Sequence, residues 1–199
     1  MVKKFVRDHF FYKAKKNGHL ARSFYKLQEA DQKFKLLKPD LRVLDLGCAP
    51  GSWIEYCLEK IGSRGYIIGI DRIAPDRIFP GVDIILEDIH NVQPEDLLAT
   101  GSPFDLVLSD MAPDTTGSPS VDCYRSYELS MIALKFTDRL LKEEGNFFCK
   151  IFQGQDFKHF LDEVKIRFRR AVAFKPKASK KASREVYIIG INKRTQNEP

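Results

Sequence analysis

Two charged side chains stand in or directly after stretches whose composition predicts buried strands. Lys150 lies within the apolar run 146–152, and Asp110 follows the apolar run 106–108. Charged residues are seldom buried without a partner or a task. We therefore predict that Lys150 and Asp110 belong to a functional site, and proton transfer is a reaction that these residue types can perform.

Acidic residues also end two other predicted strands. Asp71 follows the strand 66–70, and Asp88 stands near the end of the strand 82–86. In open α/β sheets, ligands bind beyond the carboxyl ends of the strands. Asp71 could accept two hydrogen bonds from a ribose diol, and Asp88 could meet an adenine amine with Ile89 beside the ring. Each acid alone could equally be a helix cap or a solvated loop residue.

A loop rich in glycine and proline follows the first predicted strand, 42–46. Its sequence from Asp45 is Asp-Leu-Gly-Cys-Ala-Pro-Gly-Ser-Trp. The glycines permit a close backbone approach, and the proline stiffens the turn. The loop lacks the Gly-x-Gly-x-x-Gly spacing and the Gly-Lys-Ser/Thr sequence that dinucleotide and triphosphate sites use. The pattern therefore disfavours both of these ligand classes.

The elements that would position these residues alternate along the chain. We predict strands at 42–46, 66–70, 82–86, 104–109, 146–152, 171–174 and 186–191, and helices at 53–61, 123–141 and 156–168. This order indicates an α/β fold with a mostly parallel, seven-stranded sheet and helices on both faces. We expect a single domain over residues 1–199. Its segment 1–36 is predicted to be a basic helical extension, packed on the sheet edge through Ala21, Phe24, Tyr25, Leu27 and Gln28.

Positive charge is concentrated in two segments of the chain. Residues 1–26 contain eight Lys or Arg and one acid, and residues 165–185 contain nine and one. Because the whole chain carries +6, the other 152 residues sum to −9. Such blocks favour a polyanionic partner, and nucleic acid above all. The alternative is that they are solvated helix faces and a loop.

Other functional classes have little support in the sequence. Cys48, Cys57, Cys123 and Cys149 are scattered without a Cys-x-x-Cys pair, which argues against a zinc site or a disulfide framework. The four histidines show no metal-ligand spacing, so no metal is expected. The first residues lack the apolar stretch of a signal peptide or a membrane span. We expect a cytoplasmic protein without a membrane partner.

Four segments together resemble the motifs of a known family. The run from Asp45 to Trp53 resembles the cofactor motif of the FtsJ (RrmJ) ribose methyltransferases. Its later motifs are resembled, in order and spacing, by Ser109-Asp110-Met111-Ala112-Pro113, Cys149-Lys150-Ile151-Phe152-Gln153-Gly154 and Ser183-Arg184-Glu185-Val186-Tyr187. Cys48 and Ser52 depart from bacterial relatives, which often have Ala and Gly there. We expect cofactor binding to survive both departures.

The resemblance implies a Rossmann-like methyltransferase domain that uses S-adenosylmethionine. The implied cofactor-binding residues are Asp45, Gly47, Pro50, Gly51, Ser52, Trp53, Asp71, Asp88, Ile89 and Asp110. It also implies a catalytic tetrad of Lys26, Asp110, Lys150 and Glu185. In this tetrad Lys150 would be the base, provided that burial or a nearby cation lowers its pKa from about 10.4. Asp110 would orient Lys150, and Glu185 would orient Lys26 or the ribose hydroxyls.

The implied activity is methylation of an RNA ribose 2′-hydroxyl, and the implied substrate is a uridine of 23S ribosomal RNA within the large subunit. Lys and Arg residues of 1–26 and 165–185 would contact phosphates around the pocket, and we expect a monomer. Two alternatives stay open: a transfer RNA 2′-O-methyltransferase of the same family, and a non-catalytic RNA-binding assembly factor. A nicotinamide oxidoreductase is disfavoured by the loop, and an α/β hydrolase by the missing Gly-x-Ser-x-Gly.

Overall fold

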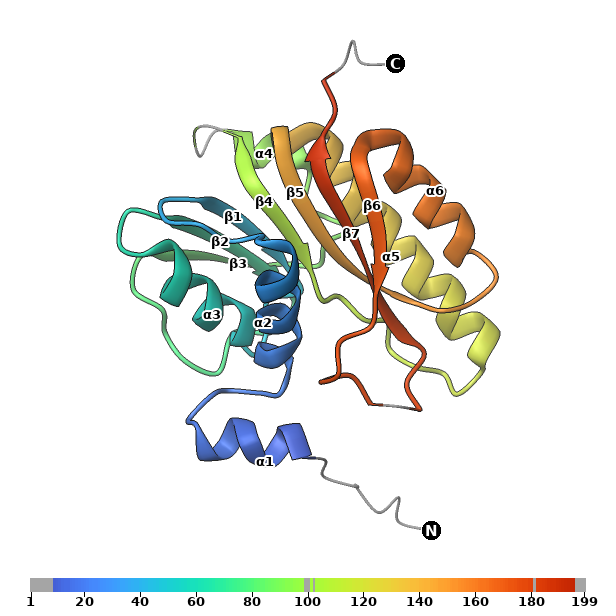
Figure 1. The fold of residues 1–199 in the computed structure, drawn as a ribbon, viewed down its shortest axis with the longest axis horizontal. Coiled ribbons are helices and arrows are strands. Elements are labelled where there is room, and N and C mark those ends of the chain that lie inside the picture. The colour runs from blue at the N-terminus through green and yellow to red at the C-terminus, as the bar shows by residue number, and fades with distance from the viewer. Residues whose placement is uncertain (1–8, 99–100, 102, 181, 196–199) are drawn as a thin grey trace.

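The computed structural model describes residues 9–98, 101, 103–180 and 182–195, and its strands form one twisted sheet (Figure 1). The strand order is β3-β2-β1-β4-β5-β7-β6. The strands are β1 (Arg42–Leu46), β2 (Tyr66–Asp71), β3 (Val82–Leu86), β4 (Phe104–Ser109), β5 (Leu141–Phe152), β6 (Phe168–Phe174) and β7 (Glu185–Lys193). β7 runs antiparallel to both of its neighbours, and the other neighbouring pairs are parallel. The predicted fold class is confirmed.

Helices cover both faces of the sheet, as predicted. α2 (Ser23–Phe34) and α3 (Ser52–Ile61) share one hydrophobic cluster with strand residues on one face of the sheet. α4 (Pro94–Leu98), α5 (Pro119–Leu140) and α6 (Phe157–Arg167) share a second cluster on the other face. The helix α4 was not predicted. α5 begins before its predicted start at residue 123, because proline is accepted in the first turn of a helix.

The N-terminal segment differs from its prediction in two ways. It forms two helices, α1 (His9–Lys16) and α2, separated by a turn in which Gly18 has a φ of 75°. It also packs on a sheet face, not on the edge, because Phe24 and Leu27 share a cluster with Leu106 and Phe148 of the central strands. Residues 5–8 of the predicted helix lie outside the described part of the chain.

The start of β5 also departs from the sequence prediction. The strand begins at Leu141, directly after α5, whereas the pattern predicted a start at residue 146. Its pairing with β4 shifts register between Phe104 and Leu106. Glu144 has a φ of 61° in this irregular stretch, and Gly145 packs against Leu141 so closely that a Cβ would lie 2.6 Å from a leucine methyl carbon. Lys142, Glu143 and Glu144 are exposed in this stretch, which is why no apolar pattern marks it in the sequence.

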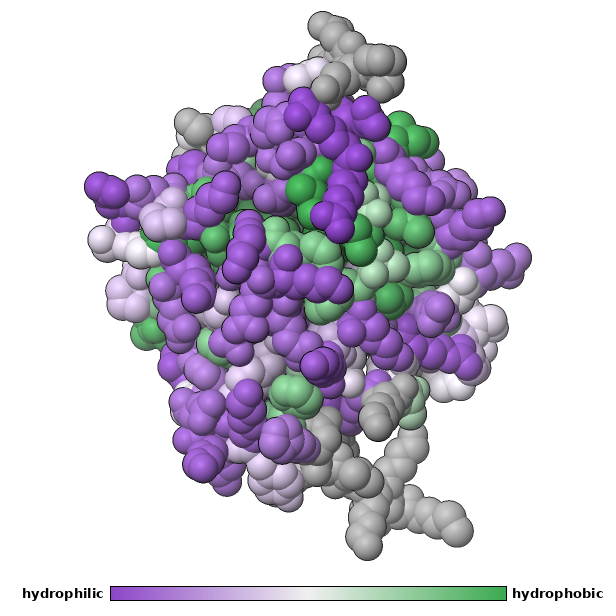
Figure 2. Space-filling model, viewed as in Figure 1, coloured by the Kyte–Doolittle hydropathy of each residue, from purple (hydrophilic) through white to green (hydrophobic). Residues whose placement is uncertain are grey.

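Figure 2 shows the surface on the side of α2 and α3. Hydrophilic side chains cover most of it, and hydrophobic ones gather over β6 and β7, where no helix covers the sheet in Figure 1. Among the described helices, none combines the length and the apolar character needed to span a membrane.

The strand order places a crevice in the sheet. From β1 the chain continues to β2 on one side, whereas β4 lies on the other side of β1. The chain leaves the carboxyl ends of β1 and β4 toward helices on opposite faces of the sheet, α3 and α5. The crevice between these two strand ends is the usual place for a ligand in such sheets.

Candidate active site

The loop after β1 touches the loop after β4. Gly47 has a φ of 79°, and a Cβ on it would lie 2.8 Å from the backbone nitrogen of Met111. Only glycine suits both this conformation and this close approach. Gly51 also has a positive φ, of 104°, just before α3 begins. Gly47 therefore brings the predicted cofactor loop against the segment that contains Asp110.

A cavity of about 500 Å³ opens at this crevice. Five predicted cofactor residues line it: Gly47, Asp71, Asp88, Ile89 and Asp110. Pocket volumes of roughly 300–1,000 Å³ are usual for small-molecule sites. Sequence reasoning did not find the wall that α5 contributes, which consists of Arg125, Glu128 and Leu129. No glycine or acidic strand end marks that wall in the sequence.

The two acids at the ends of β2 and β3 are anchored by backbone groups. Asp71 Oδ2 accepts a hydrogen bond from Ala49 N (2.9 Å), and its Oδ1 accepts one from Ile73 N (3.1 Å). Asp88 Oδ1 accepts a hydrogen bond from His90 N and lies 2.6 Å from His90 Nδ1. These bonds to His90 lower the pKa of Asp88, which keeps it ionised. Both carboxylates therefore have fixed positions in the cavity wall.

Asp45 is the most unusual acid near the crevice. Its side chain is buried, and neither carboxylate oxygen has a hydrogen-bond partner among the described residues. Burial, followed by the charges of Asp110 and Asp71, raises the pKa of Asp45 well above its ordinary value. The buried hydroxyl of Ser52 lacks a partner within the same described residues. Buried polar groups are normally hydrogen-bonded, so unsatisfied ones next to a ligand loop fit a bound polar ligand.

The rest of the predicted cofactor loop supports the site from outside the cavity. Asp45, Pro50, Gly51, Ser52 and Trp53 are not among its lining residues. The Trp53 indole nitrogen donates a hydrogen bond to Ser23 O (2.9 Å), and its ring stacks on Phe148 at 5.2 Å between centroids. Trp53 therefore ties α3 to α2 and to β5.

The four predicted catalytic residues meet in one hydrogen-bonded network. Lys150 Nζ lies 3.0 Å from Asp110 Oδ1 and also donates to the Asp110 backbone oxygen. Lys26 Nζ lies 2.8 Å from Glu185 Oε1. The Tyr187 hydroxyl joins the two pairs: it accepts from Lys26 Nζ (3.1 Å) and donates to Asp110 Oδ1 (2.7 Å).

The antiparallel β7 makes this meeting possible. Lys150 on β5 pairs in register with Tyr187 on β7, and Phe152 pairs with Glu185. The first residues of β7 therefore lie beside the last residues of β5. Tyr187 is fully buried and stacks on Phe148, with 4.7 Å between the ring centroids. Sequence reasoning did not single out Tyr187, because an aromatic residue in an apolar strand is typical of a core position.

The network fixes the protonation of its two central groups. Burial alone would raise the pKa of Asp110, but the cations of Lys150 and Lys26 and the hydrogen bond from Tyr187 together lower it. Burial, with the charges of Asp110 and Glu185, raises the pKa of Tyr187 well above 10.0. Asp110 is therefore a carboxylate that accepts hydrogen bonds, and Tyr187 is a neutral phenol that donates one.

The second basic block is divided between the two ends of the sheet. Lys175, Lys177, Lys180 and Arg184 are exposed near the start of β7, next in sequence to Glu185. Lys165, Arg167 and Arg169 lie around the start of β6, which pairs with the far end of β7. These three residues form ion pairs with Asp162, with Asp138 and Glu163, and with Glu144. The expectation that the whole block surrounds the pocket was therefore wrong.

The first basic block is only partly described. Lys13, Lys15 and Lys16 are exposed on α1, and Lys26 is buried in the network. Lys3, Lys4 and Arg7, like Lys181 of the second block, lie outside the described residues.

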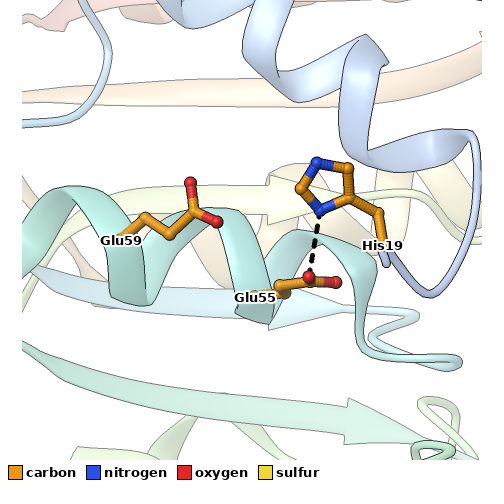
Figure 3. Close-up of side chains that lie close together, drawn as sticks. All are labelled: His19, Glu55 and Glu59. Carbon is orange, nitrogen blue, oxygen red and sulfur yellow. Dashed lines mark hydrogen bonds and ion pairs between the residues drawn. The ribbon is translucent and has the colours of Figure 1, made fainter. Parts of the chain in front are cut away.

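One histidine forms a cluster that the sequence did not predict. His19, Glu55 and Glu59 each place one possible metal-ligand atom within 4.8 Å of the others (Figure 3). His19 Nδ1 lies 3.0 Å from Glu55 Oε1, and Leu20 N donates to Glu55 Oε2. The His19 ring also stacks on Phe24. These contacts tie the turn between α1 and α2 to α3, which explains the cluster as a structural link.

Comparisons with known proteins agree with this geometry. The model of the FtsJ-like methyltransferase family matches residues 20–193. A ribosomal RNA large subunit methyltransferase E from Desulfosudis oleivorans is 46% identical over 188 residues, which cover 94% of this chain and 91% of the relative. The protein of that name from Bdellovibrio bacteriovorus is 41% identical over 191 residues, covering 94% of this chain and 97% of the relative.

A solved structure shows the same fold. It is a Plasmodium falciparum protein described as a ribosomal RNA methyltransferase, with a TM-score of 0.74 and 28% sequence identity. The match covers 87% of this chain and 97% of that one. The motifs, the sheet and the relatives lead to one conclusion: the chain belongs to the FtsJ-like methyltransferase family.

Proposed function

We propose that this methyltransferase transfers a methyl group from S-adenosylmethionine to the 2′-hydroxyl of a uridine ribose in 23S ribosomal RNA. The buried network of Lys26, Asp110, Lys150, Glu185 and Tyr187 beside the cavity carries this proposal. The relatives named ribosomal RNA large subunit methyltransferase E support the choice of substrate.

The cavity suits this cofactor. Asp71 would accept hydrogen bonds from its ribose, and Asp88 would contact the adenine amine with Ile89 beside the ring. Gly47 leaves room for the backbone approach, and Asp110 would face the methionine end. Pro50, Gly51 and Trp53 would hold the loop from behind the wall. Asp45 and Ser52 would offer the bound cofactor their buried polar atoms, which have no partner among the described residues. When bound, S-adenosylmethionine supplies an electrophilic methyl group on a sulfonium.

Lys150 takes the proton of the attacking ribose hydroxyl. After Lys150 has released one proton to solvent, its two remaining N–H bonds can donate to Asp110 Oδ1 and to the Asp110 backbone oxygen. Its lone pair then accepts the proton as the ribose oxygen attacks. The resulting ammonium is stabilised by the Asp110 carboxylate, whose lowered pKa prevents it from keeping the proton itself. The proton afterwards leaves to solvent.

Lys26, Glu185 and Tyr187 hold the substrate side of the network. Glu185 pairs with Lys26, so that this cation stays beside the Tyr187 hydroxyl and near Asp110. A fixed cation and fixed donors pre-organise the site, because they need not move when the ribose arrives. We assign positioning of the ribose to Lys26 and Glu185.

Exposed lysines around the network bind the RNA backbone. Lys175, Lys177 and Lys180 are exposed in the loop before β7, and Lys15 and Lys16 are exposed on α1. Phosphate contacts of this kind make binding steeply dependent on salt. A flat salt response would count against these lysines as RNA contacts.

Because the network comes from one chain, we propose that residues 1–199 act as a single-domain monomer, in the cytoplasm where ribosomal RNA is used.

The test is transfer of labelled methyl from S-adenosylmethionine by the purified protein. Large-subunit RNA, the large subunit itself and transfer RNA are offered separately. The proposal expects label in large-subunit RNA, lost on substitution Lys150→Ala. Label in transfer RNA alone would favour the transfer RNA alternative. Binding of RNA without any transfer would favour the assembly factor.

A further inference from the structure

The loop 175–184, between β6 and β7, has an inner and an outer side. Pro176 and Ala178 are buried, whereas Lys175, Lys177 and Lys180 are exposed. Ala178 belongs to the hydrophobic cluster that also contains Phe24 of α2. The loop therefore packs its small residues on the protein and turns its lysines outward.

Glu29 of α2 holds the inner side of this loop. Its Oε2 accepts a hydrogen bond from Lys177 N (2.8 Å), and its Oε1 accepts one from Ala178 N (3.0 Å). These two amides lie outside β6 and β7, so the sheet does not bind them. Hydrogen bonds to a carboxylate are about twice as strong as neutral ones. One side chain thus satisfies two neighbouring amides of the loop.

Ser179, the next residue, connects the loop to the network. Its hydroxyl donates a hydrogen bond to Glu185 Oε1 (2.7 Å), the oxygen that also pairs with Lys26 Nζ. Lys26 and Glu29 lie three residues apart on α2, so they are neighbours on the helix surface. The contacts close a ring: Glu29 holds the loop, Ser179 holds Glu185, and Glu185 holds Lys26.

We propose that Glu29 is a positioning residue that couples the lysine loop to the Lys26–Glu185 pair. RNA bound to the outer side of the loop is thereby placed in a fixed relation to the catalytic network. This inference rests on the proposed function, because it concerns how the RNA substrate is positioned. Without Glu29 the loop still carries its lysines, but the amides of Lys177 and Ala178 lose their hydrogen bonds to α2.

The test compares Glu29→Gln with three other variants, Glu143→Gln, Lys177→Ala and Ser179→Ala. The Gln amide can accept only one of the two loop hydrogen bonds. Glu143→Gln is the matched control, since it removes the same charge from the irregular start of β5, at the opposite end of that strand from Lys150. Lys177→Ala removes a loop cation and keeps the backbone amide. The measurements are KM for RNA, kcat at saturating RNA, and hydrogen exchange of the Lys177 and Ala178 amides.

For Glu29→Gln we expect faster exchange of the amide that loses its acceptor, a higher KM, and a kcat about tenfold lower because the substrate is misplaced. Lys177→Ala should raise KM and leave kcat unchanged, and Glu143→Gln should change neither. Ser179→Ala breaks the ring on the other side, so it should lower kcat while the Glu29 bonds protect the two amides. Ser179→Ala also tests the coupling between the loop and the Lys26–Glu185 pair if Glu29→Gln fails to fold.

An unchanged kcat in both Glu29→Gln and Ser179→Ala would overturn the coupling, even if KM rises. Thermal unfolding measures how much of each variant is folded. A kcat that falls only in proportion to the folded fraction would also overturn the coupling. Absence of RNA methylation by the unmodified protein would instead contradict the proposed function.

Discussion

The cavity and the lysine network share Asp110, but they are built in different ways. Most of the cavity residues lie at or just after the carboxyl ends of their strands, as Gly47, Asp71 and Asp88 do. The network draws on α2, the end of β4, β5 and β7, and Lys26 and Tyr187 are 161 positions apart. The cavity is therefore a local property of parallel strand ends, whereas the network depends on the insertion of an antiparallel strand beside β5.

The two regions also differ in charge. Six carboxylates and two guanidinium groups line the cavity: Asp71, Glu87, Asp88, Asp110, Asp114 and Glu128, against Arg72 and Arg125. Lys175, Lys177 and Lys180 are exposed in the loop that Ser179 connects to Glu185 of the network. A cationic methyl donor suits the first region and a polyanionic acceptor suits the second. The comparison predicts that donor binding and methyl transfer can be damaged separately.

Lys150→Ala is expected to separate methyl transfer from donor binding most strongly. Removal of the proposed general base should lower kcat by about 10²–10⁴-fold. Affinity for S-adenosylmethionine should stay as in the unmodified protein, because Lys150 does not line the cavity. Titration calorimetry and single-turnover transfer measure the two effects. Near-normal transfer by the variant would remove Lys150 from its proposed role.

Asp71→Asn should show the opposite pattern. The amide oxygen can still accept a hydrogen bond from Ala49 N, so the loop should keep its shape. Loss of the charged acceptor should raise KM for S-adenosylmethionine by about tenfold. We expect kcat at saturating cofactor to change little. If kcat falls and KM does not change, the division between the two regions is wrong.

A smaller effect is expected for Tyr187→Phe. The change removes the hydroxyl that joins Lys26 to Asp110, and it leaves the ring stacked on Phe148. We expect a loss of about 1–3 kcal/mol in the free energy of unfolding and a reduced kcat. Tyr12→Phe is the matched control, because that hydroxyl belongs to an exposed residue. Equal effects of the two substitutions would show that the bridge has no role.

The smallest effect is expected for Asp45→Asn in the absence of cofactor. Because the pKa of Asp45 is raised in the folded state, ionisation favours unfolding as pH rises above 3.8. The variant cannot ionise, so its stability relative to the unmodified protein should increase from pH 4 to neutral pH, by about 1–3 kcal/mol. Urea unfolding measures this difference.

Asp40→Asn serves as the control for that series, since Asp40 pairs with Arg64 at the surface. A stability difference for Asp45→Asn that does not grow with pH would show that Asp45 is not buried as an unpaired acid.

The sequence was most informative where function follows directly from a strand end. Asp71 and Asp88 were predicted from short apolar runs, and both line the cavity. Lys150 and Asp110 were noticed as charges in or after apolar strands, and they lie 3.0 Å apart. Lys26 and Glu185 came from the family resemblance, because neither residue is unusual in its own segment.

The residues that were missed depend on long-range geometry. Tyr187 looks like a core aromatic until β7 is placed beside β5. Glu29 and the amide of Ala178 are 149 positions apart, and no periodic pattern links a helix glutamate to a distant loop. Trp53 belongs to the motif yet packs on β5, since a motif specifies a segment but not which way each side chain points.

The position of the transferred methyl group tests the central claim most directly. A 2′-O-methyl ribose cannot use its 2′-oxygen to cleave the adjacent phosphodiester, so alkali leaves that linkage intact. After labelling of large-subunit RNA and alkaline hydrolysis, we expect the label in an alkali-resistant dinucleotide with uridine on its 5′ side. Label recovered in mononucleotides, and therefore on a base, would contradict it.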